Sequence, residues 1–341
     1  MASKVTSNPR SPLSRRSLLR AGCAALAGSA LLAACGKRAV PRGTLPTLRV
    51  AIVGKGEGDT RLMLKAAGVS FESYHVEYSN FTSGERVIEA LNGGSLDWGG
   101  MSEIPPVFAA ASPIRSFRQI AVLHGDVNNQ AVVVPAGSTL QDLKDLKGRR
   151  VGYVRATTTQ YFLNRMLESV GLKWSDITPV PMDVADGLAA FSSGKLDAWA
   201  IYGYPIQRVR ADGARILRTA QGFLSGNYII SAHVDALADP IRSDLITRYL
   251  RASRRGYAWT VAHRDAWAQI VSQEIGVPLS EVQDQFRRAS DVYELRPVTE
   301  AAIASQQGVA DAFAKAGLLP GPVDVRPLWD PRFNDIILEN A

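Results

Sequence analysis

Residues 151–160 read Val151-Gly152-Tyr153-Val154-Arg155-Ala156-Thr157-Thr158-Thr159-Gln160. The apolar start of this segment predicts a short buried strand, and apolar residues follow it with helical spacing at Phe162, Met166 and Val170. The pattern therefore predicts a strand that leads directly into the N-terminus of a helix. Units of this kind, repeated along a chain, are typical of α/β proteins.

Three consecutive threonines stand at the expected helix start. Thr157 and Gln160 fit a capping box, in which the hydroxyl accepts from a backbone N–H and the glutamine reaches back. A cap needs only one hydroxyl, and β-branched residues are second-rate helix formers, so a cap leaves Thr158 and Thr159 unexplained. Hydroxyls beside free N–H groups, with the helix dipole and Arg155, suit the oxygens of an anion. We predict an oxyanion site here, with a plain helix cap as the alternative.

The positive charge of the chain is concentrated at its N-terminus. The net charge is +7, and residues 1–38 contain seven lysines and arginines and no acidic residue. Charges in the remaining chain therefore balance. This balance does not indicate a nucleic-acid partner, and it means that local geometry must hold any bound anion.

Residues 1–36 resemble an export leader. A twin-arginine pattern at residues 14–20 precedes a weakly apolar run, residues 21–34, that is too short to span a membrane. Residues 32–36, Leu-Ala-Ala-Cys-Gly, resemble a bacterial lipobox, which predicts lipid attachment at Cys35. The alternative is a soluble secreted protein. We expect the mature protein in the periplasm or on the outer face of the cytoplasmic membrane.

Two segments of the remaining chain are near copies. Residues 91–100 read LNGGSLDWGG and residues 191–200 read FSSGKLDAWA. Each predicts a helix that ends on glycine, followed by a Leu-Asp pair that begins a buried strand. A chain of 341 residues also exceeds one typical core. We expect two lobes, residues 45–126 plus 232–341 and residues 127–231, and a parallel sheet covered by helices in the second.

The usual signatures of catalysis are not found in this sequence. The histidines have no metal-ligand spacing, and neither a nucleophile elbow nor a Walker loop occurs. Together with the leader, this favours a binding protein over an enzyme, with no cofactor and no metal.

At residues 101–106, 155–160 and 196–202, the sequence resembles the aliphatic sulfonate and taurine binding proteins of bacterial ABC importers, within the type II periplasmic binding proteins. The similarity runs from residue 48 to about residue 329. It implies an α/β fold of two doubly wound lobes with a ligand cleft between them. It also implies that a monomer binds a sulfonate or similar small organic oxyanion and delivers it to membrane permease subunits.

The resemblance also implies roles for individual residues. The three threonines stand where the family has serines, and Arg155 replaces a lysine, either to contact the anion in a bidentate manner or to lie on the rim. Trp199 would wall the cleft. Glu103 either caps its own helix or meets a cationic group of the ligand. The complete expected ligand-binding set is Thr157, Thr158, Thr159, Arg155, Gln160, Trp199, Tyr202, Met101, Ser102, Thr82, Ser83, Gly84 and Lys55.

Other functions remain open at this stage. The same fold could bind nitrate, an aromatic sulfur compound or a pyrimidine precursor of thiamine, because the family's Ile-Trp-Asp-Pro-Tyr is replaced by residues 201–205, Ile-Tyr-Gly-Tyr-Pro. An enzyme like the related pyrimidine synthases is a further alternative, although those rely on a cysteine-rich segment. The last alternative is a sensor protein that presents its ligand-bound state to a membrane partner.

Overall fold

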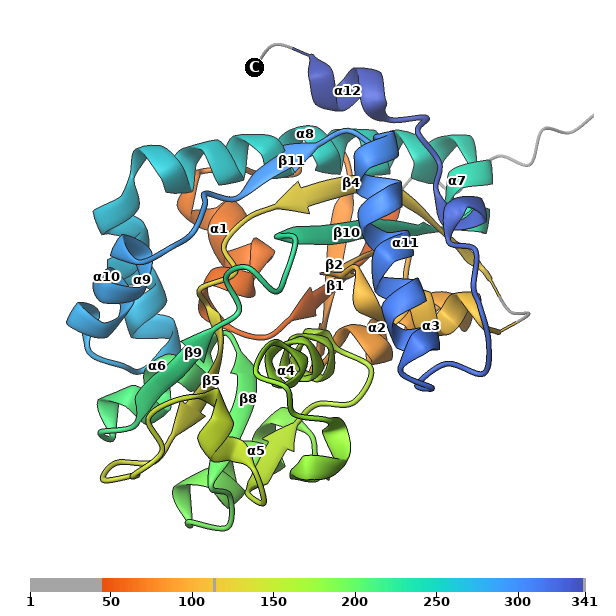
Figure 1. Cartoon of the computed structure of the whole chain (residues 1–341). Coiled ribbons are helices and arrows are strands. Elements are labelled where there is room, and N and C mark those ends of the chain that lie inside the picture. The colour runs from red at the N-terminus through yellow and green to blue at the C-terminus, as the bar shows by residue number, and fades with distance from the viewer. Residues whose placement is uncertain (1–44, 113–114, 340–341) are drawn as a thin grey trace, which may run out of the picture. The chain divides into compact units, whose positions relative to one another are not determined.

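Two mixed β-sheets form the framework of the molecule (Figure 1). The computed structural model describes residues 45–112 and 115–339, which belong to one compact unit. The leader and Cys35 lie outside the described residues. The first sheet has the order β11 (Glu294–Arg296), β4 (Phe117–His124), β10 (Asn227–His233), β3 (Trp98–Ser102), β1 (Thr47–Val53), β2 (His75–Phe81). The second has the order β7 (Thr178–Pro181), β6 (Arg150–Tyr153), β8 (Ala198–Tyr202), β5 (Gln130–Val134), β9 (Arg215–Thr219).

Helices pack on both faces of each sheet. The α-helices are α1 (Thr60–Ala66), α2 (Gly84–Asn92), α3 (Ile104–Ala110), α4 (Thr158–Ser169), α5 (Val184–Ser192), α6 (Tyr204–Ala211), α7 (Val234–Ala238), α8 (Pro240–Ala262), α9 (Arg264–Ile275), α10 (Leu279–Arg287), α11 (Glu300–Lys315) and α12 (Asn334–Leu338). The short 3-10 helices are η1 (Gly56–Gly58), η2 (Leu143–Leu146), η3 (Trp174–Asp176) and η4 (Arg326–Leu328). None of the described helices combines the length and apolar character needed to span a bilayer.

Strand β8 shows how the sequence pattern builds these layers. Ala198 and Ala200 belong to the apolar core that also contains the inward face of α4, whereas Trp199 and Ile201 belong to the core beside α5 and α6. Side chains alternate across a strand, so a continuous apolar run is buried on both faces. The first sheet is covered in the same way, by α1, α8 and α9 on one face and by α2, α3 and α11 on the other. The predicted α/β fold is confirmed.

The sequence predicted a parallel second sheet, and this prediction is wrong for one strand. Strand β5 runs antiparallel to both β8 and β9, while β6 is parallel to β7 and β8. Its first residue, Gln130, lies beside Tyr202, the last residue of β8. The chain therefore enters this sheet at the edge where the other strands end, and β5 must run in the opposite direction. Strand β10 enters the first sheet in the same way, because Asn227 lies beside His124.

The near copies in the sequence form equivalent structures. Asp97 accepts from the backbone N–H of Arg49 at 2.9 Å and forms an ion pair with its guanidinium. Asp197 accepts from the backbone N–H of Arg150 at 2.8 Å and forms the same ion pair. Each aspartate thereby ties the start of one strand, β3 or β8, to its neighbour in the sheet.

The chain passes between the sheets twice, and the two passages lie side by side. The N–H of Gly125 donates to the carbonyl oxygen of Gly226 at 3.0 Å. Because β10 starts at Asn227, residues 227–231 belong to the first sheet, not to the second lobe in which they were expected. The division into two lobes otherwise stays a proposal.

Candidate functional site

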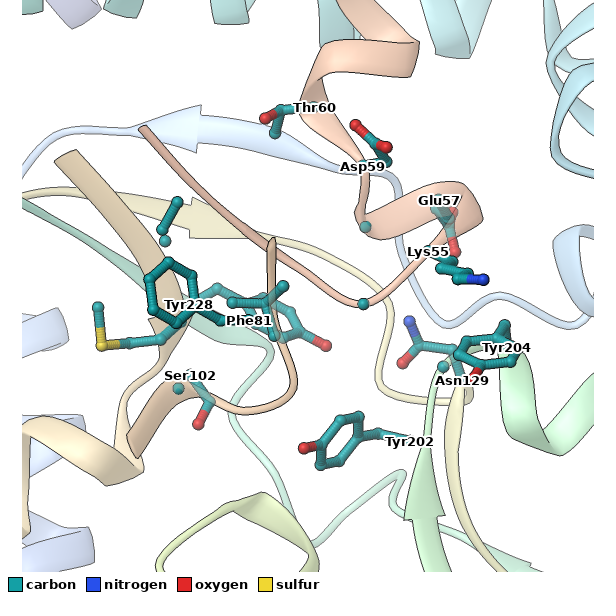
Figure 2. Close-up of a pocket in the computed structure, with 18 of the residues that line it drawn as sticks. Lys55, Glu57, Asp59, Thr60, Phe81, Ser102, Asn129, Tyr202, Tyr204 and Tyr228 are labelled. Carbon is teal, nitrogen blue, oxygen red and sulfur yellow. The ribbon is translucent and has the colours of Figure 1, made fainter. Parts of the chain in front are cut away.

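A cavity of about 550 Å³ is lined by residues of both sheets. Strands β1, β2 and β3 end at this cavity, and so does β8, as expected for an open α/β sheet. Figure 2 shows part of the lining, including Lys55, Ser102 and Tyr202. Eight of the residues expected from the sequence line it: Lys55, Thr82, Gly84, Met101, Ser102, Thr157, Thr158 and Tyr202.

The three threonines at the start of α4 have different roles. Thr157 and Thr159 both donate their hydroxyl hydrogens to the carbonyl oxygen of Val154, at 2.8 and 3.0 Å, and Thr159 Oγ1 also accepts from the Val154 N–H at 2.9 Å. They fasten the helix start to the end of β6. Thr158 lines the cavity, and its hydroxyl has no hydrogen-bond partner among the described residues. Thr157 also lines the cavity, but its hydroxyl is already bonded, so Thr158 is the threonine whose hydroxyl is placed to meet a ligand.

The helix cap differs in detail from the predicted capping box. The hydroxyl of Thr157 accepts from the N–H of Thr159 at 3.3 Å, and Gln160 Oε1 accepts from the N–H of Ala156 at 2.8 Å. Ala156 has φ = 53°, the left-handed region that favours glycine. The turn is therefore one residue tighter than a capping box, and Gln160 supports it without lining the cavity.

The start of α2 faces the cavity from the first sheet. Gly84 is its first residue, and a Cβ atom there would lie 2.8 Å from Met101 Cβ and 2.9 Å from Pro105 Cγ. Thr82 lines the cavity beside it, whereas Ser83 is buried and does not. Helix starts have backbone N–H groups without intrahelical partners, so α2 and α4 both present donors to this space.

Five expected site residues do not line the cavity, including Gln160 and Ser83 described above. Trp199 is fully buried between α5 and the second sheet, where Gly187 leaves room for its ring, so it does not wall the cleft. Thr159 is turned into the β6–α4 junction. Arg155 is exposed and lines a neighbouring hollow with Gln160 and Trp174, which places it outside the cavity. Direct contact of any of the expected residues with a ligand stays a prediction.

Aromatic side chains that the sequence did not single out form much of the wall. They are Phe81, Trp98, Tyr204, Tyr228, Tyr257 and Tyr293. Tyr204 lies within the altered Ile-Tyr-Gly-Tyr-Pro segment, which was a usable signal. Tyr257 and Tyr293 come from α8 and the segment before β11, more than fifty residues from any motif, and no local pattern marks them.

Two carboxyls with raised pKa values lie on the first-sheet side. Burial and the nearby charge of Asp126 raise the pKa of Glu57 to about 7, while Gln285 donates to it at 2.9 Å. Burial also raises the pKa of Glu103 to about 7, although Ser225 and Ser305 donate to it at 2.6 and 3.1 Å. Glu103 neither caps α3 nor lines the cavity. It joins the second passage between the sheets to α11.

The family model described as NMT1/THI5 like matches residues 75–266. A protein of Escherichia coli (strain K12), provisionally named an aliphatic sulfonates-binding protein, is 28% identical over 259 residues, which is 75% of this chain and 80% of that protein.

Solved structures show the same relationship. The alkanesulfonate-binding protein SsuA from Xanthomonas axonopodis pv. citri, solved bound to MOPS, is 27% identical, with a TM-score of 0.75 over 84% of this chain and 99% of its own. The desulfurization enzyme DSZB is 16% identical, with a TM-score of 0.60 over 86% of this chain and 99% of its own. The second similarity concerns the fold alone. Together these matches confirm the expected periplasmic binding-protein fold.

Proposed function

Because the chain belongs to the NMT1/THI5-like family, we propose that it is the solute-binding protein of an ABC importer for an aliphatic sulfonate or a similar small organic oxyanion. Two similar proteins support this function. One is provisionally named an aliphatic sulfonates-binding protein, and the other is an alkanesulfonate-binding protein of known structure. The cavity between two sheets, at the strand ends where open α/β folds bind ligands, supports it too.

One observation carries the proposal: neutral hydrogen-bond donors from both sheets converge on one cavity. The start of α2 at Gly84 and the hydroxyl of Ser102 come from the first sheet, and the start of α4 with Thr158 comes from the second. Several neutral N–H and O–H donors suit the three oxygens of a sulfonate. Since these donors belong to different sheets, an anion between them would hold the two together.

The remaining parts of the proposal concern the cellular setting. We place the protein outside the cytoplasm, held by a lipid on Cys35, as a monomer that meets the permease subunits of its importer. We also propose that it has no enzymatic activity. The leader pattern and the named relatives support these assignments.

A panel of anions tests the function. The full chain is heated with alkanesulfonates, taurine, nitrate and sulfate, and the melting temperature is compared with that of the free protein. A ligand at 100 times its dissociation constant adds about 2.7 kcal/mol to the free energy of unfolding. We expect the largest shift with a sulfonate. A shift with nitrate alone would reassign the ligand, and no shift with any anion would contradict the proposal.

Two neighbouring substitutions separate binding from folding. Thr158→Val removes a hydroxyl that faces the cavity, so we expect the sulfonate affinity to fall by about 1–3 kcal/mol with little change in stability. Thr159→Val is the matched control, because its hydroxyl bonds only to the β6–α4 junction. That variant should lose about 1–2 kcal/mol of stability instead. Titration calorimetry and thermal unfolding measure the two effects, and an unchanged affinity in Thr158→Val would contradict the proposed contact between Thr158 and the anion.

A further inference from the structure

A second hollow, of about 610 Å³, borders the cavity, and Pro105 lines both. Helices α2 and α3 and the segment after α11 line this hollow from the first sheet, while the β6–α4 turn and η3 line it from the second (Figure 1). Its lining contains no residue of the two passages near Gly125 and Gly226. The two walls of the hollow therefore belong to different sheets, and no passage of the described chain joins them there.

The hollow adjoins the helix starts that face the cavity. Gly84, the first residue of α2, lines the cavity, and the next residue, Glu85, lines the hollow. Thr157, the N-cap of α4, lines the cavity, and Arg155, two residues earlier, lines the hollow. Any movement that brings Glu85 towards Arg155 therefore also brings the donors at the starts of α2 and α4 towards each other.

Glu85 and Arg155 are opposite charges without partners. Arg155 is exposed, and its guanidinium makes neither a hydrogen bond nor an ion pair within the described part of the chain. Glu85 is half-buried and forms no ion pair with any described residue. Glu89, the other carboxylate that lines the hollow, is already paired with Arg86 at 2.9 Å. Glu85 is thus the free counter-charge that Arg155 meets if the walls approach each other.

A second pair of opposite charges spans the same two parts in reverse order. Glu89 is the chief cause of a raised pKa at Arg86, and Asp183, which precedes α5 of the second sheet, also contributes. Asp183 is exposed and has no ion pair among the residues that the structure describes. The first sheet therefore offers Glu85 and Arg86 in succession, and the second offers Arg155 and Asp183. Crossed pairs of this kind favour one register between two surfaces.

Resting on the proposed function, we propose that Arg155 is a positioning residue, which pairs with Glu85 when the two sheets close on a bound anion. Asp183 pairs with Arg86 in the same movement. These pairs hold the starts of α2 and α4 against the anion without touching it. An arginine suits this role because its planar fork forms two parallel hydrogen bonds with a carboxylate.

Charge reversal tests this inference in the full chain, with butanesulfonate as the probe and titration calorimetry as the measurement. A new positive charge near the cavity would by itself strengthen the binding of an anion. Glu85→Arg should instead weaken binding by about fivefold, because two arginines then repel each other across the hollow. Arg155→Glu should weaken it by a similar factor. In 1 M salt, where the screening length is about 3 Å, both losses should shrink to less than about twofold.

A double variant and a matched control locate the effect. Glu85→Arg combined with Arg155→Glu restores the pair with its charges exchanged, so the affinity should return to within about twofold of the original. Asp265→Arg makes the same change of charge in the first turn of α9, outside the hollow and the cavity. Its affinity should stay within about twofold of the original, since an isolated surface charge contributes little. Thermal unfolding checks that each variant is folded.

The outcomes separate this inference from the proposed function. Unchanged or tighter binding by Glu85→Arg overturns the inference and leaves sulfonate binding intact. A double variant as weak as the single variants overturns the pairing of Glu85 with Arg155. If neither butanesulfonate nor any other anion of the panel binds the unmodified chain, the proposed function fails and this inference fails with it.

Discussion

The two sheets contain the same helix-to-strand unit but embed it at different depths. The Asp97 side chain is fully buried and pairs with both Arg49 and Arg242, a residue of α8. The Asp197 side chain is 31% exposed and pairs with Arg150 alone. The long helix α8 accounts for the difference, because the second sheet has no counterpart to it among the described residues. One sequence motif therefore supports a core ion pair in one sheet and a surface pair in the other.

The same contrast extends to the cavity. The first-sheet side contains Glu57 and the nearby Glu103, two carboxyls whose pKa burial raises to about 7. The second-sheet side presents hydroxyls and aromatic rings, from Thr158, Tyr202 and Tyr204. Titration near neutral pH should therefore act through the first sheet, whereas the neutral hydrogen-bond donors come from both sheets.

The largest expected effect is a loss of stability on substitution of Asp97, which we expect to exceed the loss on substitution of Asp197. Asp97→Asn leaves Arg49 and Arg242 without their shared counter-charge, and breaking a buried pair costs about 3–4 kcal/mol of unfolding free energy. Asp197→Asn removes a half-exposed pair and should cost less than about 1 kcal/mol. Urea unfolding of both variants gives the comparison. Equal losses would show that the depth of the unit does not matter.

The next effect concerns pH. The raised pKa of Glu103 means that the folded protein keeps this proton to higher pH than the unfolded chain does. Its contribution to stability is therefore largest below its ordinary pKa and is lost as pH rises through about 7. Glu103→Gln stays neutral, so its stability relative to the original protein should rise by about 2–3 kcal/mol between pH 5 and pH 8.

Unfolding curves at several pH values test this, with the difference between the two proteins as the readout, because other titrating groups then cancel. A constant difference across the range would mean that Ser225 and Ser305 hold the carboxylate ionised in the folded state. The second passage between the sheets would then contain a permanent charge.

The smallest expected effect is a difference in stability and sulfonate affinity between substitutions of Gly84 and Ser83 at the start of α2. Gly84→Ala places a methyl group against Met101 and Pro105, and overpacking of this size costs about 1–2 kcal/mol. We also expect weaker sulfonate binding, since the helix start must shift. Ser83→Ala removes a hydroxyl that makes no cap hydrogen bond, and both stability and affinity should stay within about 0.5 kcal/mol. Calorimetry and thermal unfolding of the pair would contradict this if Ser83 were the more sensitive position.

Local patterns predicted the elements of this fold well. The apolar strand ending near Val154 and the helix after the threonines both form, and the repeated Leu-Asp pairs form matching ion pairs. These features depend on spacing within a few residues, which a sequence displays directly. The direction of β5 and β10 depends on where the chain enters each sheet, and no local spacing records that.

The candidate site was predicted in part. Thr158 and Gly84 were found because helix starts have recognisable sequences. Trp199 was misplaced because alternation along β8 directs it into the core beside α5, and a resemblance cannot show which face a strand turns to the cavity. Tyr257 and Tyr293 in the cavity wall were missed altogether, since no local pattern marks these positions in α8 and in the segment before β11.

The two passages between the sheets have a consequence for the order of folding during synthesis. All five strands of the second sheet come from one uninterrupted segment, residues 130–219, so this sheet is complete as soon as β9 has emerged. The first sheet, although its synthesis begins earlier, must wait for β10 and β11. The later-starting half is thus able to finish first. A ribosome-stalled chain ending near residue 226 would contain one finished sheet and one unfinished sheet, whose central gap only β10 can close.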